Sequence, residues 1–227
     1  MSEVAGRLLR VRERIAAACE RARRDPQSVR LIAVSKTFPA AAVREAMAAG
    51  QTLFGENRVQ EALAKIGEIG SGARWHLVGR LQTNKAKHAA GAFELIHGID
   101  GRELAAELDR RAEAKATTQA VLVQANLAAE PTKAGAGEDE LWPLIEDVAQ
   151  RTHLALRGLM IIPPLEPDPE RARPWFRRLR ELRDLASSRL GRPLPELSMG
   201  MTDDFEVAVE EGATLVRVGR AVFGERA

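Results

Sequence analysis

The chain lacks the residues on which several kinds of site are built. Cys19 is the single cysteine among 227 residues, which excludes an internal disulfide and any metal site made of several thiolates. Tyrosine is absent, and aromatic residues make up only 4% of the chain. No dense basic tract carries interleaved aromatics, so nucleic-acid binding is not indicated. The four histidines show no paired ligand spacing, and we therefore predict no metal.

Long apolar runs and a strong excess of charge are missing as well. The 34 lysines and arginines nearly balance the 32 acidic residues, which leaves a formal net charge of +2. No apolar stretch reaches the length of a membrane-spanning helix, and the N-terminal region has no signal-peptide core. We expect a soluble cytoplasmic protein without membrane partners. Hydrophobic residues, at 45%, suffice for a sizeable core, and we predict a single domain over residues 1–227.

The sequence is organised as a regular alternation of two patterns. Residues 4–24 predict an amphipathic helix, and short apolar strands follow at Leu31–Ser35, Thr52–Phe54, Arg74–Val78, Glu94–His97, Ala120–Asn126, Ala155–Met160, Glu196–Met199 and Thr214–Val218. Helical patterns separate them, at Ala40–Ala49, Asn57–Ile69, Thr83–Ala89, Arg102–Ala116, Glu138–Arg151, Pro169–Leu190 and Asp203–Glu211. Strict alternation indicates a parallel sheet. The eight units favour an α/β fold, a closed (β/α)₈ TIM-type barrel with an additional N-terminal helix, over an open doubly wound sheet.

One lysine stands where such a barrel places its chemistry. Lys36 follows the apolar run of the first strand, within LIAVSKT (31–37), and active sites of these barrels form at the carboxyl ends of the strands. A desolvated lysine there is more easily a neutral amine, able to form an imine with an aldehyde. The simpler interpretation is that Lys36 ends the strand and extends its amine into water.

The segments after the seventh and eighth strands predict an anion site. They read SMGMTDD (198–204) and VRVGRAVFG (216–224), each with a glycine that permits close backbone approach before a helix. Barrels of this type often bind phosphate with these two loops. The acidic pair Asp203-Asp204 counts somewhat against phosphate, although acids are also ordinary in a first helical turn.

Arg217 interrupts the otherwise apolar eighth strand. A guanidinium in such a strand needs an acceptor. A structural interpretation is a salt bridge to a carboxylate such as Glu56, and a functional one is a ligand phosphate, carboxylate or heteroaromatic nitrogen. His76, by contrast, is interpreted as a hydrogen-bonded strand histidine. An aldehyde-seeking lysine, an anion cradle and a buried arginine together suggest pyridoxal 5′-phosphate, which has an aldehyde, a phosphate and a ring nitrogen.

Six motifs, in order, carry a resemblance to a known family. They are AVSKT (33–37), FGENRVQE (54–61), WHLVGRLQTNK (75–85), GLMIIP (158–163), LSMGMTDD (197–204) and VRVGRAVFGER (216–226). With these motifs the chain resembles the pyridoxal phosphate homeostasis protein family, whose barrel is of the alanine-racemase type. The resemblance runs from about residue 31 to residue 226 and implies pyridoxal 5′-phosphate as the cofactor.

The resemblance also implies roles for single residues. Lys36 would form the imine with the cofactor, Asn57 would lie near its ring hydroxyl and Arg217 would face the pyridine nitrogen. The remaining cofactor-binding residues are Met160, near the ring, and Ser198, Thr202, Gly219 and the backbone of Arg220, which would hold the phosphate. Lys133 matches a family lysine linked to secondary cofactor handling.

The chain departs from the family pattern at a few positions. Thr202 stands where serine is common, and both supply a hydroxyl. Arg220 stands where a small hydroxyl residue is frequent, Arg58 replaces an aromatic of some members, and the usual final Asp-Tyr is absent. The resemblance therefore leaves open whether the Arg220 side chain contacts the phosphate.

Three functions compete. The resemblance implies a carrier and buffer of pyridoxal 5′-phosphate in vitamin B6 and amino-acid homeostasis, not an enzyme, with cofactor-dependent apo-enzymes as candidate recipients. A small racemase needs a second acid/base group, which in alanine racemases is a tyrosine from a C-terminal domain of the partner subunit. This chain has no tyrosine, and the barrel uses its length, so we expect a monomeric carrier. A Schiff-base aldolase is the third alternative, and a lysine on the first strand counts against it.

Overall fold

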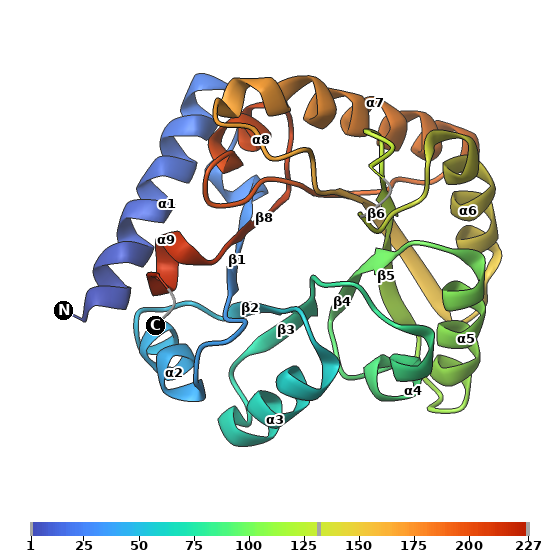
Figure 1. Cartoon of the computed structure of the whole chain (residues 1–227), viewed down its shortest axis with the longest axis horizontal. Coiled ribbons are helices and arrows are strands. Elements are labelled where there is room, and N and C mark those ends of the chain that lie inside the picture. Colours follow the sequence, from blue (N-terminus) through green and yellow to red (C-terminus); the bar gives the residue numbers. More distant parts are fainter. Residues whose placement is uncertain (1, 131–132, 226–227) are drawn as a thin grey trace.

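The computed structural model describes residues 2–130 and 133–225, and it is a closed barrel of eight parallel strands (Figure 1). Each strand pairs with the next, and β8 pairs with β1. The strands are β1 (Arg30–Val34), β2 (Leu53–Glu56), β3 (Arg74–Leu77), β4 (Leu95–Ile99), β5 (Gln119–Ala125), β6 (Leu154–Ile161), β7 (Glu196–Ser198) and β8 (Leu215–Val218). The predicted (β/α)₈ barrel is confirmed.

Helices surround the barrel on the outside. They are α1 (Glu3–Arg21), α2 (Ala40–Ala48), α3 (Val59–Ile69), α4 (Ala86–Ala89), α5 (Arg102–Glu113), α6 (Glu138–Gln150), α7 (Arg173–Leu190), α8 (Phe205–Glu210) and α9 (Arg220–Phe223). Short 3₁₀ turns are η1 (Pro26–Ser28), η2 (Thr83–Lys85) and η3 (Pro169–Ala172). The helix predicted to begin at Pro169 therefore starts with a 3₁₀ turn, which the Asp168 side chain caps by accepting from the Glu170 N–H. None of the described helices combines the length and hydropathy that crossing a membrane requires.

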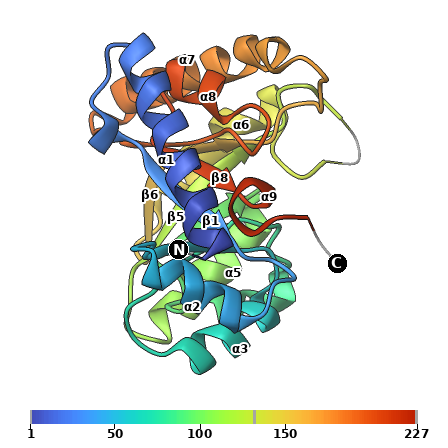
Figure 2. The same cartoon turned by 90° about the vertical axis from the view of Figure 1, so that its left-hand side faces the viewer.

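The additional N-terminal helix is present and covers the last units of the barrel. Ser2 caps α1 by accepting from the Ala5 N–H, and the apolar stripe predicted from the sequence is buried. The helix lies beside α8 and α9, which Figure 2 shows from the side of α1. Ion pairs from Arg14 and Arg21 to α8 add to this contact. The two ends of the described chain thus pack against each other.

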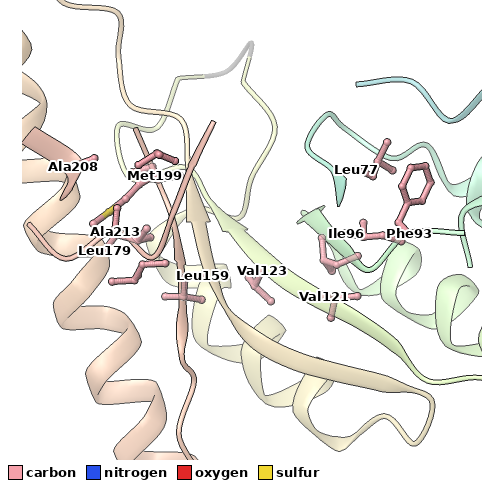
Figure 3. Packing of buried hydrophobic residues seen from close by; sticks show 14 of the residues in the cluster. Leu77, Phe93, Ile96, Val121, Val123, Leu159, Leu179, Met199, Ala208 and Ala213 are labelled. Atoms are coloured by element: carbon pink, nitrogen blue, oxygen red, sulfur yellow. The ribbon is translucent and has the colours of Figure 1, made fainter. Parts of the chain in front are cut away.

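Apolar side chains form two separate clusters because successive strand residues point to opposite faces of the sheet. The larger cluster fills the layer between strands and helices, and Figure 3 shows part of it, with Val121 and Val123 on β5, Leu159 on β6 and Leu179 on α7. The smaller cluster fills the barrel interior and consists of Ile32, Val34, Leu53, Val78, Leu95, Leu122, Met160 and Leu215. These apolar side chains pack much of the barrel interior.

Candidate ligand-binding site

A cavity of about 400 Å³ opens at the carboxyl ends of the strands. Residues at or after the ends of β1, β2, β3, β5, β6, β7 and β8 line it. Six of the eight residues predicted to bind the cofactor line this one cavity: Lys36, Asn57, Thr202, Arg217, Gly219 and Arg220. These residues come from positions between 36 and 220 of the sequence, and they meet here because parallel strands carry all their carboxyl ends to one face.

Two predicted residues do not line the cavity. Met160 is fully buried in the interior cluster, and Ser198 is fully buried with its hydroxyl bonded to Arg217 and His97. The two residues are partners in the β6–β7 register, so both lie at one level of the barrel. A motif identifies the strand that carries a residue, but it does not give the depth at which the side chain lies.

The lining of the cavity is strongly cationic. It contains one carboxylate, Asp203, and five cationic side chains, which are Lys36, Arg80, Lys133, Arg217 and Arg220. Arg220 Nη2 lies 2.5 Å from Asp203 Oδ2, and both side chains are more than half exposed. Asp203, one of the two acidic residues that counted against an anion site, is thus paired with an arginine from the neighbouring loop. This excess of positive charge suits a multiply charged anion.

Arg217 lines the cavity from inside the barrel. Its Nη1 donates to Ser198 Oγ over 2.6 Å, and its Nη2 donates to the Ile161 carbonyl over 2.9 Å. Burial lowers the pKa of Arg217 to about 10, and the Asp204 carboxylate opposes that effect. The guanidinium therefore stays charged near neutral pH. The structural interpretation of Arg217 as the partner of Glu56 is wrong, because Glu56 bonds to Ser35 and Lys65.

A buried charge cluster holds the backbone on both sides of Lys36. Lys65 Nζ, from α3, donates to the Ser35 carbonyl and to Glu56 Oε1, each over 2.7 Å. Ser35 Oγ donates to the same Glu56 oxygen over 2.6 Å. The Thr37 N–H donates to Glu61 Oε1 over 2.6 Å, and Glu61 also accepts from Lys65. The cluster thereby fixes the residues before and after the lysine.

The same contacts explain an unusual backbone conformation. Thr37 has φ +67°, a left-handed conformation that β-branched residues rarely adopt. The bond from its N–H to Glu61 offsets that strain. Our sequence interpretation missed Lys65, although a signal was present: it interrupts the apolar stripe of α3, between Ala62 and Ile66.

Relatives of this chain share its length and its barrel. A family model described as "Alanine racemase, N-terminal domain" matches residues 7–227. The pyridoxal phosphate homeostasis protein of Aquifex aeolicus (strain VF5) is 47% identical over 221 residues, which is 97% of both chains. The solved structure of PipY from Synechococcus elongatus PCC7942 with PLP bound has a TM-score of 0.87 at 40% identity, covering 98% of this chain and 100% of that one.

The chain belongs to the pyridoxal phosphate homeostasis protein family. Its barrel is shared more widely, since the alanine racemase of Bacillus anthracis reaches a TM-score of 0.68 at 17% identity. That comparison covers 95% of this chain and 56% of the racemase, and it concerns the fold alone.

In this member of the family, Lys133 forms part of the cavity wall. Its Nζ donates to the Pro163 carbonyl over 2.9 Å and lies 2.5 Å from Glu130 Oε2, so it links the loops after β5 and β6. A role of Lys133 in secondary cofactor handling stays a prediction. Across residues 2–130 and 133–225, no three His, Cys, Asp or Glu side chains gather in a way that could hold a metal ion.

A close backbone contact fixes Asn57 at the cavity. A Cβ atom added to Gly79 would lie 2.4 Å from the Asn57 carbonyl oxygen and 2.7 Å from its Cα. Real side chains do not approach backbone this closely, so the loops after β2 and β3 touch only because residue 79 is glycine. This contact fixes the position of the Asn57 backbone at the cavity.

We expect Gly79→Ala to lower the free energy of unfolding by about 1–3 kcal/mol, because the added methyl overpacks the contact with Asn57. Urea unfolding monitored by circular dichroism measures the change. Gly67→Ala is the matched control, since Gly67 lies inside α3 with open space around it. That control should gain about 0.5–1 kcal/mol from helix propensity. Equal stability of Gly79→Ala and the parent chain would contradict the proposed contact.

Proposed function

We propose that this chain binds pyridoxal 5′-phosphate in the cavity at the carboxyl ends of the strands and holds it as a carrier and buffer. One observation carries the proposal: Lys36, Arg217 and the loops after β7 and β8 all line a single cationic cavity. The family membership and the PLP-bound structure of PipY support it. The proposed role is homeostasis of the cofactor, without substantial catalytic turnover.

The donor set fits the functional groups of the cofactor one by one. When bound, pyridoxal 5′-phosphate supplies an aldehyde that condenses reversibly with a lysine amine and releases one water. Lys36 would supply that amine, and Arg217 would donate to the ring nitrogen. Thr202, Gly219 and Arg220 would hold the phosphate, with a hydroxyl, a side-chain-free backbone and a guanidinium. Asn57 would lie near the ring hydroxyl, while Met160 and Ser198 would act from beneath the cavity.

Arg217 also argues for holding the cofactor rather than using it. A guanidinium that stays protonated near neutral pH has donors and no acceptor, so it does not stabilise a protonated ring nitrogen. The cofactor withdraws electrons most strongly when its ring nitrogen is protonated. The arginine therefore favours a bound but weakly reactive cofactor.

A small amino-acid racemase is the second candidate, because a second amine reaches the same cavity. Lys133 lines it together with Lys36, and a two-base route needs two such groups. Against this, the Lys133 amine is engaged with Glu130 and Pro163, and the 227 residues contain no tyrosine. The monomeric state, the cytoplasmic location and the recipient apo-enzymes stay predictions.

The test is to add pyridoxal 5′-phosphate to cofactor-free protein, remove the excess by gel filtration and record the absorption spectrum. We expect one cofactor retained per chain, with a new absorption band. Incubation of the loaded protein with single enantiomers of amino acids should show no racemisation on chiral chromatography. Failure to retain the cofactor would overturn the proposal, and racemisation at the turnover numbers typical of enzymes would replace it with the second candidate.

Replacing Arg217 by glutamate should change the spectrum of the bound cofactor. The introduced carboxylate can accept from a protonated ring nitrogen, which the guanidinium cannot, so we expect the absorption band to move. Arg220→Glu is the control, because it makes the same change of charge at the rim of the cavity. This control should weaken cofactor retention without moving the band. An unmoved band in Arg217→Glu would place the ring nitrogen elsewhere.

A further inference from the structure

Four polar side chains form a hydrogen-bonded chain across the barrel interior. Arg217 Nη1 donates to Ser198 Oγ over 2.6 Å, Ser198 Oγ lies 2.8 Å from His97 Nδ1, and His97 Nε2 lies 2.9 Å from His76 Nδ1. The residues come from β8, β7, β4 and β3. Ser198 and both histidines are fully buried, and Arg217 is 4% exposed. The chain therefore runs from the cavity into the packed core.

The hydrogen bonds of this network all run in one direction: each group donates to the next one farther from Arg217. A guanidinium can only donate, so Ser198 Oγ accepts from it. Among the contacts of the described residues, His97 Nδ1 is then the acceptor for the Ser198 hydroxyl proton. An acceptor at Nδ1 makes His97 the Nε2–H form, which donates to His76 Nδ1. His76 in turn carries its proton on Nε2.

The far end of the chain agrees with this direction. His76 Nε2 is buried without a hydrogen-bond partner among the described residues, and Glu94 Oε1 lies 3.8 Å from it. Glu94 immediately precedes β4, so it lies at the end of the barrel opposite the cavity. Its carboxylate attracts an N–H at Nε2. Burial lowers the pKa of His76 to about 3 and that of His97 well below its usual value, so both rings are neutral.

We propose that His97 is a positioning residue for Arg217, and that it acts through Ser198. Two bonds fix the guanidinium, one to Ser198 and one to the Ile161 carbonyl. Arginine has five N–H donors, so three are left for the cavity that Arg217 lines. The orientation of those three depends on a hydroxyl whose own direction His97 sets. The inference rests on the proposed function, in which Arg217 donates to the ring nitrogen of the cofactor.

The rest of the barrel interior indicates that these four polar side chains do more than fill space. The interior cluster is apolar, and Leu95, two residues before His97 on the same strand, belongs to it. Polar groups buried there cost free energy unless each is bonded. Among the fully buried side-chain atoms of this network, His76 Nε2 alone lacks a hydrogen-bond partner within the described residues. A bonded chain that ends on the guanidinium is expected if its function is to hold that group in one orientation.

Two nearly isosteric variants of His97 test the inference. In His97→Asn, the side-chain amide occupies the place of Nδ1 and can still accept a hydrogen bond from Ser198. In His97→Gln, the amide reaches the place of Nε2, so the hydrogen bond with Ser198 is lost. Each variant removes one end of the same buried bridge, so both should unfold at similar temperatures. We expect His97→Gln to move the absorption band of the bound cofactor and weaken its binding by about tenfold, the effect of one hydrogen bond to a charged group. His97→Asn should bind and absorb like the parent chain.

A purely structural role of His97 would change both variants equally, and that outcome would overturn the inference. The nitrogen-15 NMR shifts of the cofactor-free protein provide a second test. We expect both His76 and His97 in the Nε2–H form, and a proton on Nδ1 of His97 would also overturn it. Failure of the proposed function can be told apart from failure of this inference. If the parent protein retains no cofactor, the proposed function is wrong, and NMR still tests the hydrogen-bonded network. Equal variants in a cofactor-binding protein defeat the inference alone.

Discussion

Replacing Lys36 by alanine should abolish covalent retention of pyridoxal 5′-phosphate while leaving the barrel folded. Lys36 lines the cavity with a half-buried side chain just after β1, where its loss leaves the core intact. Without this amine the cofactor keeps only its contacts to phosphate and ring, and it should be lost on gel filtration. Reduction of the loaded protein with borohydride, followed by peptide mass spectrometry, locates the covalent bond.

Lys133→Ala is the matched control for this prediction. Lys133 is the other lysine that lines the cavity, so it tests whether any nearby amine suffices. In this control, borohydride reduction should still attach one cofactor per chain to Lys36. Trapping that persists in Lys36→Ala and disappears in Lys133→Ala would show that the assignment of the amine is wrong.

Replacing Lys65 by methionine should lower the free energy of unfolding by about 3–5 kcal/mol, the cost of leaving one partner of a buried ion pair alone. Glu56 is fully buried, and its Oε2 has no partner among the described residues even in the parent chain. Lys65 also holds the Ser35 carbonyl, so the variant should bind the cofactor less tightly as well. Urea unfolding at constant pH measures the first effect, and titration with cofactor measures the second.

The effect of Lys65→Met should depend on pH with a definite sign. Burial raises the pKa of Glu56 above its usual value, although Lys65 and Ser35 lower it in part. A folded-state pKa above the unfolded one means that stability is greatest at low pH and falls as the pH rises through both values. Removing Lys65 enlarges that difference. The loss of stability should therefore be smallest in acid and grow toward neutral pH.

The double variant Glu56→Gln with Lys65→Met separates charge from packing. Once the carboxylate is gone, the methionine no longer leaves a buried charge unpaired, so most of the lost stability should return. A double variant as unstable as Lys65→Met alone would mean that the loss comes from packing of the lysine stem.

The part of the site that could be predicted from the sequence depends on topology. Lys36 follows the first strand and Arg217 belongs to the last, and strict alternation of strands and helices already implied that the ends of these strands share one face. Neither the depth of Ser198 nor that of Met160 follows from such reasoning, because depth depends on barrel tilt and register. Both residues lie below the cavity lining.

Contacts between distant side chains were harder to predict. His76 was correctly interpreted as a hydrogen-bonded strand histidine, but its partner is on the next strand, 21 residues away. Register between neighbouring strands decides that pairing, and the sequence does not show register. Glu56 illustrates the same limit: charge alone suggested it as one possible partner of Arg217, whereas its actual partner is a lysine on the adjoining helix.

Closure of the barrel joins the beginning of the chain to its end. Ile32 on β1 is the register partner of Arg217 on β8, and α1 packs beside α8 and α9. During synthesis, β1 therefore cannot pair with β8 until almost the whole polypeptide has left the ribosome. Long-range pairing of this kind forms slowly. Lys36 and Arg217 line one cavity only once that closure is complete. Cofactor capture would consequently report that a newly made chain has finished folding.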